Sequence, residues 1–251
     1  MKKNIILLTL AVLLLSGAQT FAKGKPTLYI IGDSTVAHNT LPIVGWGDAI
    51  KPMFDSLKIE VVNKARGGRS CRTFYNEGAW AEVRDMLKPG DYILMGFGHN
   101  DGAPQARGSA PGGITEDVVE VKQFDGSIEK VHTFGWYMDL FVREAKEKGA
   151  QPILFSQIPW RELYDGKSKR TAFGPYFQEI ADLEKVEYID LNSLVIEKYE
   201  AMGQEEINKF FEKDHTHTNR LGADLNAATV IEGIKSLKHC KLKKYIRRDL
   251  K

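Results

Sequence analysis

The sequence is poor in cysteine and has no long apolar run beyond its N-terminal segment. Its 251 residues include two cysteines, Cys71 and Cys240, so the fold cannot depend on a network of disulfides. Whether the two form one bridge or remain free thiols stays open at this point. No later stretch approaches the roughly 20 apolar residues that a membrane-spanning helix needs, which argues against membrane insertion.

Neither sign of charge dominates. The chain has 35 Lys and Arg against 33 Asp and Glu, a net charge of +2. Lys2 and Lys3 account for this excess, and without them the charges balance. A general affinity for nucleic acid is therefore not expected. The one basic segment is the tail, about residues 238–251, which we expect to form a solvated, partly helical surface.

The N-terminal segment has the pattern of a secretory signal peptide. Lys2 and Lys3 precede an apolar run over residues 5–15, and small residues follow as far as Ala22. We predict a signal peptide over residues 1–22, with cleavage after Ala22 or alternatively Ala18, and export to a periplasm or out of the cell. The remaining residues 23–251 suit a single α/β domain with a well-buried core.

Strand-like and helix-like runs alternate after this segment, which is typical of a parallel sheet covered on both faces. We predict a three-layer α/β/α sandwich around a central, mostly parallel five-stranded sheet. The expected strands are Thr27–Ile31, Ile59–Asn63, Asp91–Phe97, Pro152–Gln157 and Glu187–Asp190. The expected helices are Trp46–Leu57, Ala79–Leu87, Trp136–Lys148, Gly174–Lys185, Leu191–Ala201 and about Leu221–Lys235.

Three glycine-containing polar segments follow the first three expected strands. They are residues 32–34 (Gly-Asp-Ser), 65–70 (Ala-Arg-Gly-Gly-Arg-Ser) and 98–101 (Gly-His-Asn-Asp). Ligands of open α/β sheets gather outside the carboxyl ends of the strands, so these segments are expected at one rim. Ser34 is placed there either as a nucleophile or as an ordinary helix N-cap.

A fourth polar segment, Asp214-His215-Thr216-His217, precedes the last expected helix. An acid three residues before a histidine can hold one ring nitrogen while the other faces a nucleophile. Asp214, His215 and His217 could instead be metal ligands. We expect no metal and no other cofactor, because histidines two residues apart diverge in a strand and no cysteine or third histidine lies nearby in the sequence.

Together the four segments resemble the conserved blocks of SGNH (GDSL-like) hydrolases, and the resemblance covers nearly the whole chain after the N-terminal segment. The first block is Gly-Asp-Ser-Thr, with Thr35 in place of the family's leucine, which argues only against a lipase-like enzyme. Within that superfamily the sequence is most similar to the rhamnogalacturonan acetylesterase branch. The supporting segments are residues 45–47, 63–70, 132–137 and 214–219.

The resemblance implies a flavodoxin-like fold and a secreted serine esterase. Ser34, His217 and Asp214 would be the catalytic residues, and the Ser34 amide, the Gly68 amide and the Asn100 side chain would form the oxyanion hole. The implied substrate is an acetylated plant cell-wall polysaccharide or oligosaccharide, most specifically acetylated rhamnogalacturonan (pectin). We expect the enzyme to be a monomer.

Other residues near these segments have competing interpretations. We expect Asp33 to accept backbone amides, His99 to be packed, and His217 rather than His215 to be the base. Arg66, Arg69 and Arg72 suit either a uronate carboxylate or a solvated loop. Of the candidates for substrate contact, we select Arg69 and Trp160.

The segment after Asn100 contains a hairpin signal. Residues 118–123 and 127–131 flank Phe124-Asp125-Gly126, and such a hairpin either walls the substrate groove or is a structural addition. Four other functions also stay open: a xylan or general acetylesterase, a lipase- or thioesterase-like hydrolase, a non-catalytic glycan-binding protein, and an acyltransferase.

Overall fold

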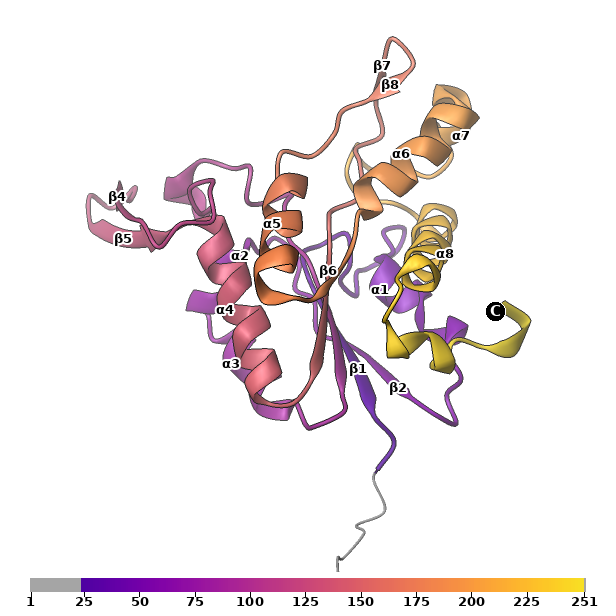
Figure 1. The fold of residues 1–251 in the computed structure, drawn as a ribbon. Helices are drawn as coiled ribbons and strands as arrows, with labels where there is room; N and C mark the ends of the chain where they lie inside the picture. Colours follow the sequence, from indigo (N-terminus) through magenta and orange to yellow (C-terminus); the bar gives the residue numbers. More distant parts are fainter. Residues whose placement is uncertain (1–23, 251) are drawn as a thin grey trace, which may run out of the picture.

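A five-stranded parallel sheet lies at the centre of the protein (Figure 1). The computed structural model describes residues 24–250, so the predicted signal peptide lies outside the described residues. Every neighbouring pair of strands in this sheet is parallel, and the spatial order is β2-β1-β3-β6-β9. The strands are β1 (Thr27–Ile31), β2 (Glu60–Asn63), β3 (Tyr92–Met95), β6 (Gln151–Phe155) and β9 (Glu187–Ile189).

Successive residues of the central strands point into two different hydrophobic cores. In β1, Leu28 and Ile30 belong to one cluster, and Tyr29 and Ile31 belong to the other. Side chains of a strand alternate between the faces of the sheet, and here both faces are covered. This explains why the strands read as continuous apolar runs in the sequence.

Helices cover each face of the sheet, as Figure 1 shows. One layer contains α2 (Cys71–Asn76), α3 (Ala79–Met86), α4 (Phe134–Glu147) and α5 (Gly174–Glu184). The other contains α1 (Trp46–Ala49), α6 (Leu191–Met202), α7 (Gln204–Asn208) and α8 (Arg220–Ser236). The predicted three-layer α/β/α sandwich is confirmed.

One predicted helix is wrong in its length. The expected helix Trp46–Leu57 is only α1, and a 3₁₀ turn over Lys51–Met53 follows it. Pro52 has no amide hydrogen and disfavours the α conformation of the residue before it, so the helix cannot continue. The short helices α2 and α7 were not predicted.

Two antiparallel hairpins project beyond the sheet (Figure 1). β4 (Val118–Lys122) pairs with β5 (Ile128–His132), which confirms the predicted hairpin. β7 (Leu163–Tyr164) pairs with β8 (Lys167–Ser168) in a hairpin too short to be predicted from alternation. Both hairpins lie in connections that leave carboxyl ends of sheet strands, after β3 and after β6.

The C-terminal tail packs more closely than predicted. It contains 3₁₀ turns over Lys241–Tyr245 and Arg248–Leu250. Leu242 and Ile246 are buried, and Ile246 forms a β-bridge with Phe54. The tail is therefore part of the core as well as a basic surface.

The two cysteines are free thiols on opposite sides of the sheet. Cys71 packs in the cluster under α2 and α4, and Cys240 packs in the cluster under α8. This decides the question left open by the sequence in favour of unpaired cysteines. Burial raises the pKa of both thiols, so they stay protonated. No helix among residues 24–250 is long and apolar enough to cross a membrane.

The order of the strands determines where a ligand can bind. The chain passes from β1 outward to β2 at one edge, and from β3 outward through β6 to β9 at the other edge. The direction in which successive strands are added to the sheet therefore reverses between β1 and β3. Flavodoxin-like sheets with this order bind ligands at that switch point, outside the carboxyl ends of the strands. The loops after β1 and β3 carry Ser34 and Asn100.

The end of β3 allows a test of how tightly the sheet is packed. A Cβ added at Gly96 would lie 2.2 Å from the backbone oxygen of Phe155 in β6, whereas one added at Gly102 would meet nothing within 4 Å. Because the backbone of β6 cannot move aside, we expect Gly96→Ala to lower the free energy of unfolding by about 1–3 kcal/mol. Gly102→Ala is the matched control, and urea denaturation of both variants measures the difference. Equal stabilities would contradict this packing.

Candidate active site

Ser34 lies in a tight turn directly after β1. The carbonyl of Asp33 accepts the amides of Val36 and Ala37, at 3.1 and 3.0 Å, so the chain turns sharply around the serine. The buried carboxylate of Asp33 accepts the amide and hydroxyl of Thr35 through one oxygen, and the amide of His99 through the other. Asp33 therefore has the structural role that the sequence predicts and joins the loops after β1 and β3.

A chain of hydrogen bonds joins Ser34, His217 and Asp214. Ser34 Oγ lies 2.7 Å from His217 Nε2, and His217 Nδ1 lies 2.8 Å from Asp214 Oδ2. An ionised carboxylate can only accept, so Nδ1 carries the proton and Nε2 is left to accept from the serine hydroxyl. This is the arrangement that lets an imidazole take a proton from a nucleophile.

Asp214 is held in its ionised form. Burial of this carboxyl would raise its pKa, but the hydrogen bond from the His217 ring, together with the amides of His217 and Thr216, lowers the pKa to about 2. The carboxylate therefore stays charged, and stays an acceptor for His217, at every pH above that value.

The loop carrying His217 is fastened to the segment that follows Ser34. The amide of Val44 donates to the Thr218 carbonyl at 2.9 Å, and the Thr218 hydroxyl donates back to the Val44 carbonyl. Asn219 caps α8 by accepting the amide of Gly222, and its side-chain amide donates to Lys209 and Glu212. These bonds hold the histidine opposite the serine.

The other two predicted segments also reach this rim. A Cβ added at Gly67 would lie 3.8 Å from Ser34 Cβ, and Gly68 has a φ of +73°, which favours glycine. Asn100 Nδ2 donates to the Arg69 carbonyl at 3.1 Å, so the two loops touch. Within residues 24–250, the amides of Ser34 and Gly68 donate to no protein acceptor, which leaves them available to a ligand.

Three aromatic rings lie in a row beside the catalytic loop. The His99 and Trp160 rings are 6.2 Å apart, and the Trp160 and His215 rings are 6.1 Å apart and nearly parallel. His215 also faces Glu162 at 3.4 Å, and the imidazole that contacts Ser34 Oγ is that of His217. Burial lowers the pKa of His99, so this packed ring stays neutral.

The three arginines of the second segment do not form one cluster. The Arg72 side chain is only 2% exposed, and its guanidinium binds Glu129 of β5 and two carbonyls of the loop after β3. It therefore fastens the β4–β5 hairpin to α2, which corrects the interpretation of Arg72 as a surface residue. Arg66 pairs with Glu82, and Arg69 pairs with Glu77 and the Gly67 carbonyl.

A pocket of about 340 Å³ adjoins the site on the side of β6 and contains residues that sequence analysis missed. The loops after β3 and β6 form it, and Gly98, His99 and Trp160 line the side next to the catalytic loops. Gln157, Lys169, Arg170 and Asn192 also line it. Gln157 ends a predicted strand. Since ligands gather outside the carboxyl ends of such strands, the sequence could have indicated this loop.

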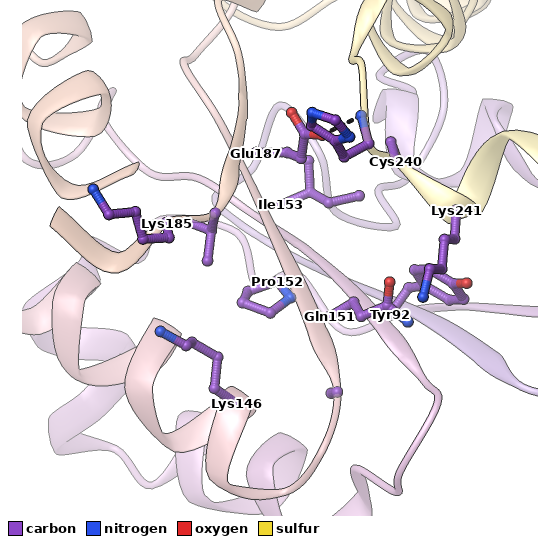
Figure 2. A pocket seen from close by; sticks show the side chains of 12 residues that line it. Tyr92, Lys146, Gln151, Pro152, Ile153, Lys185, Glu187, Cys240 and Lys241 are labelled. Carbon is purple, nitrogen blue, oxygen red and sulfur yellow. Dashed lines mark hydrogen bonds between the residues drawn. The ribbon is translucent and has the colours of Figure 1, made fainter. Parts of the chain in front are cut away.

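A pocket of about 430 Å³ lies at the other end of the sheet (Figure 2). It is lined by the first residues of β6 and β9, with Lys146, Lys185 and Lys241 around it. It contains no serine, and amino ends of parallel strands are not where such sheets bind ligands. Within residues 24–250, no group of three or more His, Cys, Asp or Glu side chains is placed to hold a metal ion.

Several known proteins are similar to this chain over most of its length. A rhamnogalacturonan acetylesterase from Emericella nidulans is 34% identical over 238 residues, which are 92% of this chain and 91% of that protein. The rhamnogalacturonan acetylesterase RhgT from Bacillus subtilis is 30% identical over 230 residues, 84% of this chain and 90% of that protein. The crystal structure of the Bacillus subtilis protein YxiM has a TM-score of 0.70 at 28% identity, covering 84% of this chain and 56% of that one. No protein-family model matches the chain.

The sheet order and the four loops at its rim place the protein in the SGNH class of hydrolases. The similarity to the two acetylesterases extends over most of each chain and is specific to one branch of that class. This chain belongs to the rhamnogalacturonan acetylesterase family and is a carboxylic ester hydrolase.

Asp101 is an unexpected buried acid next to Asn100. Its Oδ1 accepts the amide and the thiol of Cys71, both at 3.0 Å, while its Oδ2 is buried without a partner. Burial raises its pKa to about 7, partly opposed by the bonds from Cys71. Because α2 begins at Cys71, this carboxyl joins the helix to the loop after β3.

This raised pKa predicts a pH dependence of stability. Between the unfolded pKa of about 4 and the folded value of about 7, only the folded protein keeps the proton. The free energy of unfolding should therefore fall as pH rises through this window, by up to about 1.4 kcal/mol per pH unit. Asp101→Asn should lose this part of the slope in urea denaturation at pH 5 and pH 7. Parallel profiles for the two proteins would show that Asp101 does not titrate there.

Proposed function

We propose that this protein removes acetyl groups from acetylated rhamnogalacturonan by a serine acyl-enzyme mechanism. The observation that carries the proposal is the hydrogen-bonded chain from Asp214 through His217 to Ser34, at the switch point of the sheet. The substrate is supported by the similarity to two rhamnogalacturonan acetylesterases.

The first half-reaction transfers the acetyl group to the enzyme. Ser34 Oγ attacks the acetyl carbonyl while its proton passes to His217 Nε2, and a tetrahedral oxyanion forms. When the ester bond breaks, His217 returns this proton to the departing sugar oxygen and the acetyl group stays on Ser34. Asp214 keeps the His217 ring in the required tautomer and stabilises its charged form.

The second half-reaction restores the enzyme. Water replaces the sugar, His217 takes its proton, and the resulting oxygen attacks the acetyl group on Ser34. The carbon–Oγ bond then breaks, acetate leaves, and His217 returns the proton to Ser34. Both half-reactions pass through an oxyanion, which the amides of Ser34 and Gly68 and the Asn100 side chain would stabilise.

Export is part of the proposal. Lys2, Lys3 and the apolar run over residues 5–15 are typical of a signal peptide, which would take the enzyme to a periplasm or out of the cell. A cell-wall polysaccharide is too large to enter a cell intact, so the substrate and the predicted export agree.

Acetate release tests the reaction and the substrate together. We expect the enzyme to release acetate from acetylated rhamnogalacturonan fragments and to be slower on acetylated xylan. Ser34→Ala should lower this release by roughly 10⁴-fold or more, because the acyl-enzyme cannot form. Circular dichroism of the variant is the control for folding. Release from xylan alone would exclude the proposed substrate, and undiminished release by Ser34→Ala would exclude the mechanism.

Asn100 tests the oxyanion hole. Losing one preorganised donor typically costs about 3 kcal/mol in the transition state, so Asn100→Ala should lower kcat roughly 100-fold with little change in KM. Asn100→Asp keeps the shape but replaces the donor with a charged acceptor, and should lower kcat at least as much. Steady-state kinetics measure both variants. A change confined to KM would assign Asn100 to substrate binding instead.

A further inference from the structure

The charged side chains that line the 340 Å³ pocket beside the loops of Ser34 and His217 are all positive. Among the described residues that line it are two cations, Lys169 and Arg170, and no Asp or Glu. Arg170 donates to the Ser193 hydroxyl at 2.5 Å, so it is partly engaged. Lys169, in contrast, has no hydrogen bond or ion pair with any residue in 24–250, and its ammonium makes a cation–π contact with the Trp160 ring, 5.7 Å from the ring centre.

The pocket also has the other features of a sugar site. Trp160 is 36% exposed and stacks on His215, so its ring is fixed in place while part of it remains open to a ligand. Gln157 also lines the pocket, but its Oε1 is buried against Gly98 and has no partner among the described residues. A partly exposed aromatic ring and two cations, with no acid among the lining residues, suit a sugar that carries a negative charge.

The position of the pocket connects it to the reaction. Gly98 and His99 line it and directly precede Asn100, and Trp160 stacks on His215, two residues before His217. A sugar in this pocket would therefore be a neighbour of the sugar whose acetyl group faces Ser34. The acetylated unit itself has to lie at Ser34, outside this pocket.

On these observations, and given the proposed function, we propose that the pocket binds a uronate unit next to the acetylated sugar, with the carboxylate held by Lys169. Lys169 is then a specificity-determining residue. It selects acetyl esters on acidic polysaccharides over the same esters on neutral ones, because only an acidic unit gives the ammonium an opposite charge to bind.

Lys167 provides a matched control. It lies two residues away in β8, and its ammonium pairs with Glu200 at 3.0 Å. It does not line the pocket. Lys167→Gln and Lys169→Gln therefore each remove one positive charge from the same short segment. Only Lys169→Gln removes it from the proposed uronate site.

The test compares acetylated uronate oligosaccharides with the same oligosaccharides after reduction of their carboxyl groups. We expect the wild-type enzyme to have about a tenfold lower KM for the acid form. Lys169→Gln should reduce this preference to near one, and Lys167→Gln should keep it. Added salt should weaken the preference of the wild-type enzyme. A wild-type enzyme without preference, or a preference that survives Lys169→Gln, would overturn the proposal.

A second measurement separates this proposal from the proposed function. Tryptophan fluorescence can measure the binding of a uronate oligosaccharide without acetyl groups, and this measurement needs no turnover. Binding that weakens about tenfold in Lys169→Gln but not in Lys167→Gln supports the uronate site even if acetate release from pectic fragments fails. Equal binding by the two variants would overturn the uronate site whatever the esterase activity.

Discussion

The hydrogen bond between Ser34 and His217 is the interaction on which the site depends, and it joins residues 183 positions apart. α8 packs against α1, and this packing places the loop before α8 beside the turn after β1. The backbone bonds between Val44 and Thr218 complete this junction. The fold thus brings the two residues of the proposed catalytic pair together through packing of apolar faces, and the polar contacts then determine their geometry.

Two buried acids connect the segments of the same rim by accepting backbone amides. Asp33 joins the loops after β1 and β3, and Asp101 joins the loop after β3 to α2, so two loops and one helix are held by two carboxyl groups. The Asn100 side chain bonds to the Arg69 carbonyl in the same region. Because buried hydrogen bonds are costly to leave unmade, this network keeps the proposed oxyanion donors in place before a substrate arrives. The proposed substrate side of the rim differs, because Trp160 is partly exposed there and the Lys169 ammonium lies over its ring.

The sequence predicted the sheet and the four loops because both have local signals, namely apolar runs that end in glycine and polar residues. The prediction was wrong where the structure depends on a single residue or on a partner that lies far away in the sequence. Pro52 ended a helix that apolar spacing extended to Leu57. Arg72 was interpreted as part of a surface cluster, but its partner Glu129 is 57 residues away on a hairpin. The pocket around Lys169 combines loops after two different strands, and no local pattern indicates such a combination.

The most direct test of the account is the reaction of the enzyme with an aryl phosphonate ester, which leaves a stable adduct on an activated serine. Peptide mapping by mass spectrometry would locate this adduct. We expect it on Ser34, at a rate that falls roughly 100-fold in His217→Ala, because the variant has no base to take the hydroxyl proton. An adduct on another residue, or an equal rate in the two proteins, would contradict the proposal that His217 activates Ser34.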